Sequence, residues 1–279
     1  MKPLKTRWKA VAAALAMFAA PAAATAQSLF ADDAPPPAQA HLHAGWAEEE
    51  GVRIAAVRME LQPGWKTYWR SPGDSGIPPD FDWSGSENLA DVRVAWPAPI
   101  AFDTYGSRTY GYEGRMTLPL RLTPKDPSKP IRLRLALFYG VCSDVCVPGR
   151  EDLALDIAPG AAPEGAYFIR QAFEALPGSA TAAGLVGATC ELAMNADGEG
   201  DLSARLAFAE PLSSAPIVIA EGPKGVWFGQ VETKIVDGAL VADARMRAQE
   251  GVWLDRSQLR FTLLDGRGAL QHQGCDPVG

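Results

Sequence analysis

Between about residues 45 and 158, the pattern of apolar and polar positions is that of short β-strands separated by turns. Apolar and polar side chains alternate along 115–124 and again from Ile131 to Leu137. A period of two places the apolar side chains on one face of a strand and the polar ones on the other. Strands are expected at 53–61, 115–124, 131–142 and 150–158. No long helical pattern interrupts them, so this part predicts an antiparallel β-sandwich.

A short helix and a second series of strands follow. In YFIRQAFEALPG (167–178) the apolar residues recur at the spacing of one helical face, and Pro177-Gly178 ends the pattern. Strand patterns return from about residue 184. The chain is therefore predicted to be all-β, with two antiparallel β-sandwich domains and one short connecting helix. We expect the first domain at 45–158, the linker and helix at 159–179, and the second domain at 180–279.

The first 26 residues have the features of an export signal. Four basic residues precede the apolar run 11–20, which is too short to span a bilayer, and the small-residue site Ala24-Thr25-Ala26 follows. Cleavage before Gln27 is expected, and a retained anchor is the weaker alternative. Residues 27–44, rich in Pro and Ala, are expected to be a flexible lead-in. The destination is then the periplasm, where disulfides form and persist.

Charge narrows the classes of partner. Without the signal, Lys plus Arg falls from 26 to 22 while Asp plus Glu stays at 33, which gives a net charge of about −11. The basic residues form no run, and such a surface repels nucleic acid and anionic lipid. No later stretch approaches the roughly 18 apolar residues that a membrane-spanning helix needs. We expect no nucleic-acid partner and no membrane insertion, and instead proteins or small molecules as partners.

Cys142 and Cys146 lie four residues apart in FYGVCSDVCVPG (138–149). On one straight strand their Cα atoms would be about 13 Å apart, far beyond the roughly 4.4–6.8 Å that a disulfide needs. Both flanks have strand character, so we predict a hairpin with residues 143–145 at the turn and the cysteines opposite each other. A disulfide there constrains little of the unfolded chain, which favours a bond that a partner thiol opens and closes. A structural disulfide remains the alternative.

Cys190 and Cys275 lie on the first and last expected strands of the second domain. A bond between them would close a loop of about 85 residues, worth about 4–5 kcal/mol in the chain-entropy model. We therefore expect this pair to be structural.

A metal site is not expected. The chain has three histidines, His41, His43 and His272. His41 and His43 could face one way on a strand, and copper accepts such ligands. They lie far from the cysteine pair in the sequence, however, and C-x3-C is not a common zinc spacing. Solvated polar histidines are the favoured interpretation, with no cofactor.

The charges near the cysteine pair favour thiols that react slowly. Asp144, Glu151 and Asp152 would raise the pKa of nearby thiols, while Arg150 would oppose them. A thiol that stays protonated at neutral pH exchanges slowly with unselected disulfides, so exchange would depend on a docked partner.

Three segments resemble a known family: 64–83 (GWKTYWRSPGDSGIPPDFDW), 102–120 (FDTYGSRTYGYEGRMTLPL) and 138–155 (FYGVCSDVCVPGREDLAL). Together they resemble the amino-terminal periplasmic domain of the thiol:disulfide interchange protein DsbD, and more closely its ScsB-type relatives, over about residues 45–158. The resemblance implies an immunoglobulin-like domain whose cysteine pair passes electrons to oxidised periplasmic proteins. Cys142 and Cys146 match the redox pair, and the position of Cys146 implies that it forms the mixed disulfide with a partner.

The resemblance also implies a shielding loop and a separate electron donor. The family covers its cysteine pair with an aromatic cap, and the matching stretch AFDTYG (101–106) offers Phe102 or Tyr105. The chain resembles neither the membrane domain nor the thioredoxin-like domain of DsbD, and it has no C-x-x-C. The expected donor is therefore a separate membrane thiol transporter or thioredoxin-like protein.

The leading hypothesis is a periplasmic protein-disulfide reductase that reduces partner proteins through Cys142 and Cys146. The alternative is a non-catalytic module that binds partners, acts as a scaffold or handles copper, with both disulfides structural.

Overall fold

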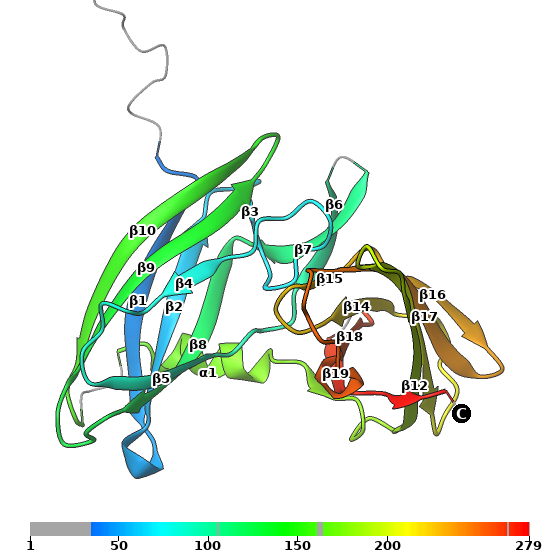
Figure 1. The fold of residues 1–279 in the computed structure, drawn as a ribbon. Coiled ribbons are helices and arrows are strands. Elements are labelled where there is room, and N and C mark those ends of the chain that lie inside the picture. The colour runs from blue at the N-terminus through cyan, green and yellow to red at the C-terminus, as the bar shows by residue number, and fades with distance from the viewer. Residues whose placement is uncertain (1–34, 105, 161–163, 267, 279) are drawn as a thin grey trace, which may run out of the picture. The chain divides into compact units, whose positions relative to one another are not determined.

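A computed structural model describes residues 35–104, 106–160, 164–266 and 268–278 (Figure 1). Residues 36–279 form one compact unit. Four sheets and one α-helix account for the regular structure of the described residues, apart from two short 3₁₀ turns, η1 (Glu49–Gly51) and η2 (Arg256–Gln258). The all-β prediction with two sandwiches is confirmed. The expected export signal, 1–26, lies outside the described residues.

The first sandwich consists of two sheets. One has the strand order β1-β2-β8-β5, formed by β1 (Ala38–Ala47), β2 (Arg53–Leu61), β8 (Arg115–Pro124) and β5 (Leu89–Val94). The other has the order β10-β9-β3-β7-β6, with β4 also paired to β9; its strands are β10 (Cys146–Ile157), β9 (Ile131–Cys142), β3 (Lys66–Tyr68), β7 (Ser107–Glu113), β6 (Ile100–Thr104) and β4 (Asp80–Asp82).

The expected lead-in at 27–44 is wrong in its second half. Ala38–Ala47 form β1, which pairs along most of its length with β2. Ala38 and Ala40 are buried in the core of the sandwich. Alanine is a weak strand former, so the alanines of this segment did not indicate a strand in the sequence. Their small side chains nevertheless fit into the core where β1 forms the edge of the sheet. The first sandwich therefore begins at β1 and not at residue 45.

Alternating side chains from both sheets fill the first core. On β8 the fully buried residues are Leu118, Leu120 and Leu122, and on β9 the odd-numbered residues from Ile131 to Val141 are buried in the same way. The even-numbered residues of β9 therefore lie on the other face of their sheet. Cys142 lies on that second face.

Helix α1 (Ala166–Glu174) packs on the outer face of the first sheet. Its Ile169 is fully buried against Ile54 and Ala56 of β2, with Phe168 at the edge of this small cluster. Residues 55 and 57 of β2 face the main core instead, so β2 is buried on both faces. The expected helix at 167–178 is thus present, although it ends earlier than its apolar pattern.

The second sandwich also has two sheets. The smaller has the order β11-β19-β18-β14, formed by β11 (Gly178–Ser179), β19 (Ala269–Gln273), β18 (Arg260–Leu264) and β14 (Ile217–Glu221). The larger has the order β15-β17-β13-β12-β20, with β16 also paired to β17; its strands are β15 (Val226–Phe228), β17 (Ala239–Ala248), β13 (Glu199–Phe208), β12 (Leu185–Met194), β20 (Asp276–Pro277) and β16 (Glu232–Val236).

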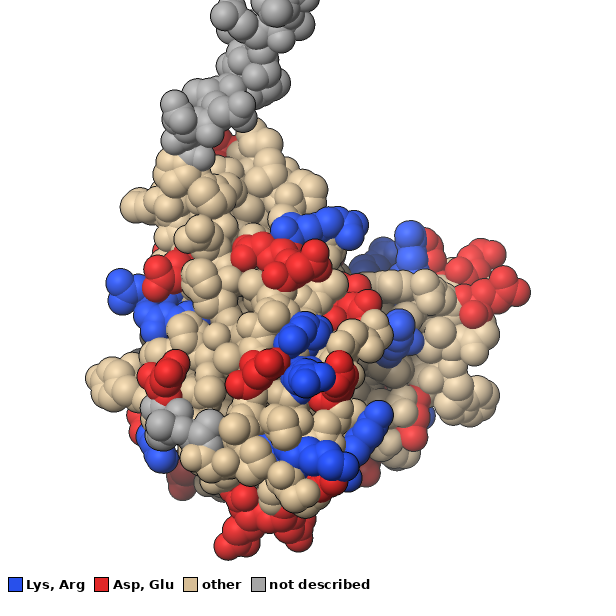
Figure 2. Space-filling model, turned by 90° about the vertical axis from the view of Figure 1, so that its left-hand side faces the viewer, with Lys and Arg blue, Asp and Glu red and all other residues tan. Residues whose placement is uncertain are grey.

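The two sandwiches touch within the compact unit. Arg70, which follows β3, donates two hydrogen bonds to the carboxylate of Glu221 on β14, at 2.7 and 2.9 Å. Ile219 and Leu264 of the second sandwich pack against the first core. On the face shown in Figure 2, acidic and basic side chains are interspersed. None of the helices among the described residues is both long and apolar enough to cross a bilayer.

Candidate functional site: a disulfide at a hairpin tip

The two longest strands of the first sandwich meet at the cysteine pair. β9 and β10 form a hairpin from Ile131↔Ile157 to Cys142↔Cys146, and these two cysteines are direct register partners. They are joined by a disulfide, with their Cα atoms 4.0 Å apart. Residues 143–145 form the turn, in which the N–H of Ser143 donates to the carbonyl of Val145. The hairpin is therefore the one that the strand pattern on both flanks predicted.

The two sulfur-bearing residues differ in their access to solvent. Cys142 is 2% exposed, whereas Cys146 is exposed on β10 and its neighbour Val145 is 64% exposed. A partner thiol or thiolate can approach Cys146 but not Cys142. The exposed apolar side chain of Val145 beside Cys146 suits contact with a protein surface.

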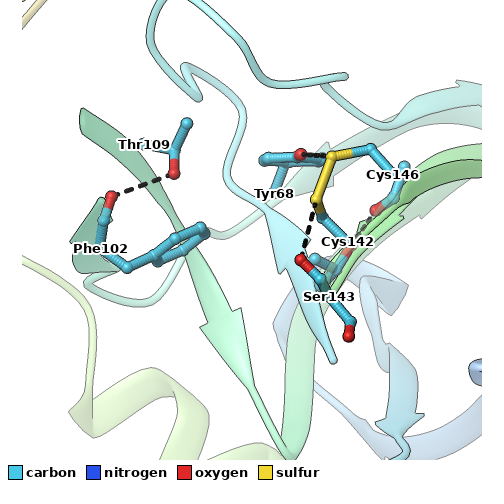
Figure 3. The surroundings of a disulfide bond; sticks show 8 residues. Tyr68, Phe102, Thr109, Cys142, Ser143 and Cys146 are labelled. Carbon is cyan, nitrogen blue, oxygen red and sulfur yellow. Dashed lines mark hydrogen bonds between the residues drawn. A yellow bond between two sulfur atoms is a disulfide. The ribbon is translucent and has the colours of Figure 1, made fainter. Parts of the chain in front are cut away.

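Tyr68 of β3 contacts the exposed cysteine. Its hydroxyl oxygen lies 3.3 Å from Sγ of Cys146, and because a disulfide sulfur carries no proton, the phenol is the donor (Figure 3). Tyr68 is fully buried. This burial raises the pKa of Tyr68, so the phenol keeps its proton and remains a donor through neutral pH.

A glycine on β9 makes room for the Tyr68 ring. A Cβ atom at Gly140 would lie 2.9 Å from the Tyr68 ring and 2.7 Å from Cβ of Ile77. The carbonyl of Gly140 accepts a hydrogen bond from the Thr67 hydroxyl at 2.9 Å, which fixes β3 against β9. Sequence reasoning missed Tyr68 and Gly140, because their roles depend on the pairing of β3 with β9, which no local pattern predicts.

Of the two expected cap residues, the structure describes Phe102. It lies on β6, its carbonyl accepts a hydrogen bond from the Thr109 hydroxyl at 3.1 Å, and its ring points toward the side on which the disulfide lies (Figure 3). The Lys66 ammonium lies 5.3 Å from the centre of that ring. Tyr105 is outside the described residues. A shielding role for Phe102 stays a prediction.

Comparison with known proteins identifies the first sandwich. Residues 31–157 match the family model of the thiol:disulfide interchange protein DsbD, N-terminal. The first sandwich is therefore similar to the N-terminal domain of DsbD. The resemblance inferred from the sequence is confirmed over this range.

One solved structure extends the likeness to both sandwiches. The N-terminal periplasmic domain of ScsB from Proteus mirabilis superimposes with a TM-score of 0.66 at 23% sequence identity, covering 90% of this chain and 97% of that chain. The reduced N-terminal domain of DsbD from Neisseria meningitidis gives a TM-score of 0.29 at 17% identity, covering 47% of this chain and 93% of that chain. Comparison with curated protein sequences gave no match. The likeness to ScsB shows a shared two-sandwich fold.

The second disulfide lies in the second sandwich, away from the hairpin of the first. Cys190 on β12 is fully buried in the second core and is bonded to Cys275, with the Cα atoms 5.7 Å apart. Cys275 immediately precedes β20, the strand that pairs in parallel with β12. The bond therefore fastens the end of the described chain to the second sandwich.

The acidic residues near the cysteines do not all face them. Glu151 lies on the opposite face of β10 from Cys146, and its carboxylate accepts hydrogen bonds from the Tyr139 hydroxyl at 2.6 Å and from the N–H of Ala40. Burial, followed by the contact with Glu151, raises the pKa of Tyr139. The expectation that Glu151 acts on the thiols is therefore wrong, because the strand alternation turns it toward β1.

The histidines are distributed over both sandwiches. His41 and His43 both lie on β1 with ring centres 6.4 Å apart, and His272 lies on β19 of the second sandwich. Within the part of the chain that the structure describes, no group of three or more His, Cys, Asp or Glu side chains is arranged to hold a metal ion.

Proposed function

We propose that the protein is a periplasmic thiol–disulfide exchange protein that reduces disulfides of partner proteins through Cys142 and Cys146. The observation that carries the proposal is the unequal exposure of two cysteines that close a three-residue turn. Because one sulfur of this disulfide is accessible at the end of the hairpin, a thiolate of another protein can attack it and open the bond. The family match of residues 31–157 supports the same reaction class.

The roles of the cysteines follow from their exposure. In the reduced protein the Cys146 thiolate attacks one sulfur of a partner disulfide, the partner's S–S bond breaks, and its other sulfur leaves as a thiolate that takes up a proton. The Cys142 thiolate then attacks Sγ of Cys146. The intramolecular disulfide forms, the mixed disulfide breaks, and the partner leaves with two thiols. Two electrons have then passed from this protein to the partner.

The proposal needs two classes of partner. The acceptors are oxidised periplasmic proteins. The donor is a separate membrane thiol transporter or thioredoxin-like protein, whose thiolate attacks the accessible Cys146 and regenerates the reduced pair. The exposed apolar side chain of Val145 beside Cys146 supports docking of a protein surface there.

The test is trapping of the mixed disulfide. In Cys142→Ala, Cys146 has no intramolecular partner, so disulfide-linked adducts with periplasmic proteins should accumulate. Cys146→Ala is the matched control, because its remaining Cys142 is buried and should trap far less. Equal trapping by the two variants would contradict the assigned roles.

A thiol count separates exchange from the scaffold alternative. Mild dithiothreitol should release two thiols from the native protein, at Cys142 and Cys146, as counted by mass after alkylation. Release of none, together with no trapping by either variant, would make both disulfides structural and favour a non-catalytic module.

A further inference from the structure

A row of four side chains crosses the sheet that carries the site. Glu113 on β7 is the register partner of Lys66 on β3, Lys66 is the partner of Cys142 on β9, and Cys142 is the partner of Cys146 on β10. Directly opposite residues of antiparallel strands project from the same face, with Cβ atoms about 4.5–5.5 Å apart. Lys66 is therefore the immediate neighbour of the buried cysteine, on the side away from Cys146.

Weak contacts hold the Lys66 ammonium in the oxidised protein. Nζ lies 3.3 Å from a carboxylate oxygen of Glu113 and 5.3 Å from the ring centre of Phe102, and the Lys66 side chain is 30% exposed. A disulfide carries no charge, so Cys142 does not compete for the ammonium in this state. Exposed ion pairs and cation–π contacts are individually weak, so the long side chain can turn toward a new anion on the next strand.

A buried thiolate at Cys142 needs such a cation. Removal of a thiolate from water disfavours the charged form, and a nearby positive charge is the usual compensation. Lys66 is the cation in direct register with Cys142. The other charged or titratable groups near the pair are Asp144 in the turn, Tyr68 on Cys146, Arg150 over the Phe138 ring, Asp103 paired with Arg108, Asp74 in the 70–78 loop, and Arg70 paired with Glu221.

We propose that Lys66 stabilises the thiolate of Cys142 in the step that resolves the mixed disulfide, and that Glu113 moderates this effect by competing for the ammonium. The inference rests on the proposed function and adds a residue to it. In that step the Cys142 thiolate forms its bond to Sγ of Cys146 while the bond from Cys146 to the partner breaks. The electron pair leaves with the partner sulfur, which takes a proton from solvent.

The first measurement is a titration of Cys142 alone. In the full chain with Cys146→Ala, thiolate absorbance at 240 nm is followed against pH, with the Cys142→Ala/Cys146→Ala protein as the blank. Lys66→Met should raise the midpoint by about one pH unit, the lower end of the range for loss of a neighbouring opposite charge. Lys66→Arg should restore it. Glu113→Gln should lower it, because the ammonium is then free to face Cys142.

The second measurement separates attack from resolution. Reduced protein with both cysteines is mixed with 5,5′-dithiobis(2-nitrobenzoate), and thionitrobenzoate release is followed in time. The first equivalent reports attack by Cys146, and the second reports resolution by Cys142. At pH 7, Lys66→Met should slow the second phase about tenfold and leave the first unchanged, as expected for a midpoint moved by about one unit.

Defined outcomes overturn the inference. A midpoint unchanged in Lys66→Met, no rescue by Lys66→Arg, or a shift in Glu113→Gln of the same sign as in Lys66→Met would each refute a role through charge. Any of these results leaves the exchange function standing if Cys142→Ala still traps partners. Shifts as expected without trapping would instead overturn the exchange function, and with it the assignment of Lys66 to a resolving step.

Discussion

The two disulfides should differ in their contribution to stability, because they close loops of very different length. Cys190 and Cys275 are 85 residues apart, whereas Cys142 and Cys146 are 4 apart. In the chain-entropy model a cross-link stabilises the fold by restricting the unfolded chain, and its effect grows with the logarithm of the loop length. The informative perturbation is therefore replacement of each pair by Ala, compared within one protein.

The expected magnitudes follow from those separations. Loss of the Cys190–Cys275 bond should lower the free energy of unfolding by about 4.5 kcal/mol, and loss of the Cys142–Cys146 bond by about 2 kcal/mol. Each double variant removes one buried sulfur and one more accessible sulfur, so the free-energy cost of the space left behind is similar in the two proteins. The difference of about 2.5 kcal/mol between the two losses of stability therefore reflects loop length. For a chain of this size the melting temperature should fall by roughly 10–15 °C in the first case and 4–8 °C in the second.

Urea unfolding under non-reducing conditions, followed by tryptophan fluorescence, measures both variants against the native protein. Thermal unfolding by circular dichroism provides an independent check. Equal losses for the two pairs, or a larger loss for the hairpin pair, would refute the reasoning from loop length. A free thiol at Cys190 or Cys275 in the native protein would remove its premise.

Two further predictions concern the hairpin site and helix α1. Gly140→Ala places a Cβ against the Tyr68 ring and should lower the free energy of unfolding, measured with urea, by about 1–3 kcal/mol. It should also slow the release of thionitrobenzoate in the two-phase assay. An unchanged stability and an unchanged rate would mean that the Tyr68 ring is free to move. His43 packs edge-on against Phe168 of α1, and burial, then the charge of Arg58, lowers its pKa below the ordinary value of 6.5. The unfolded chain therefore binds more protons below pH 6.5, so the melting temperature should fall between pH 7 and pH 5. His43→Gln should flatten that fall, and an unchanged pH dependence in this variant would contradict the assignment to His43.

The strand pattern predicted the first sandwich best where the alternation is strong. The expected strands at 53–61, 115–124 and 131–142 coincide with β2, β8 and β9. In contrast, β17 (Ala239–Ala248) lies in the middle of the largest sheet of the second sandwich and was missed. Several of its inward positions are alanines, whose contrast with polar neighbours is small, and burial there comes from the strands on both sides.

The site was predictable only as far as local sequence reaches. The hairpin and its cysteines follow from one continuous segment. Tyr68 and Lys66 lie on β3, a strand of three residues that two neighbouring strands hold in the sheet, and Gly140 of β9 has its role only because β3 pairs with β9. Three residues carry no periodic signal, and the register that aligns Lys66 with Cys142 is a property of the assembled sheet.

The short strand β20 has a consequence for self-association. β12 lies next to the edge of its sheet, and β20 pairs with it at Thr189 and Cys190, near the middle of a ten-residue strand. An edge strand free along its whole length can add a strand from another molecule, which is the first step of edge-to-edge aggregation. Because the Cys190–Cys275 bond holds β20 at the centre of β12, an incoming strand finds no continuous row of backbone donors and acceptors. We therefore expect this disulfide to limit edge-to-edge association of β12 in addition to stabilising the second sandwich.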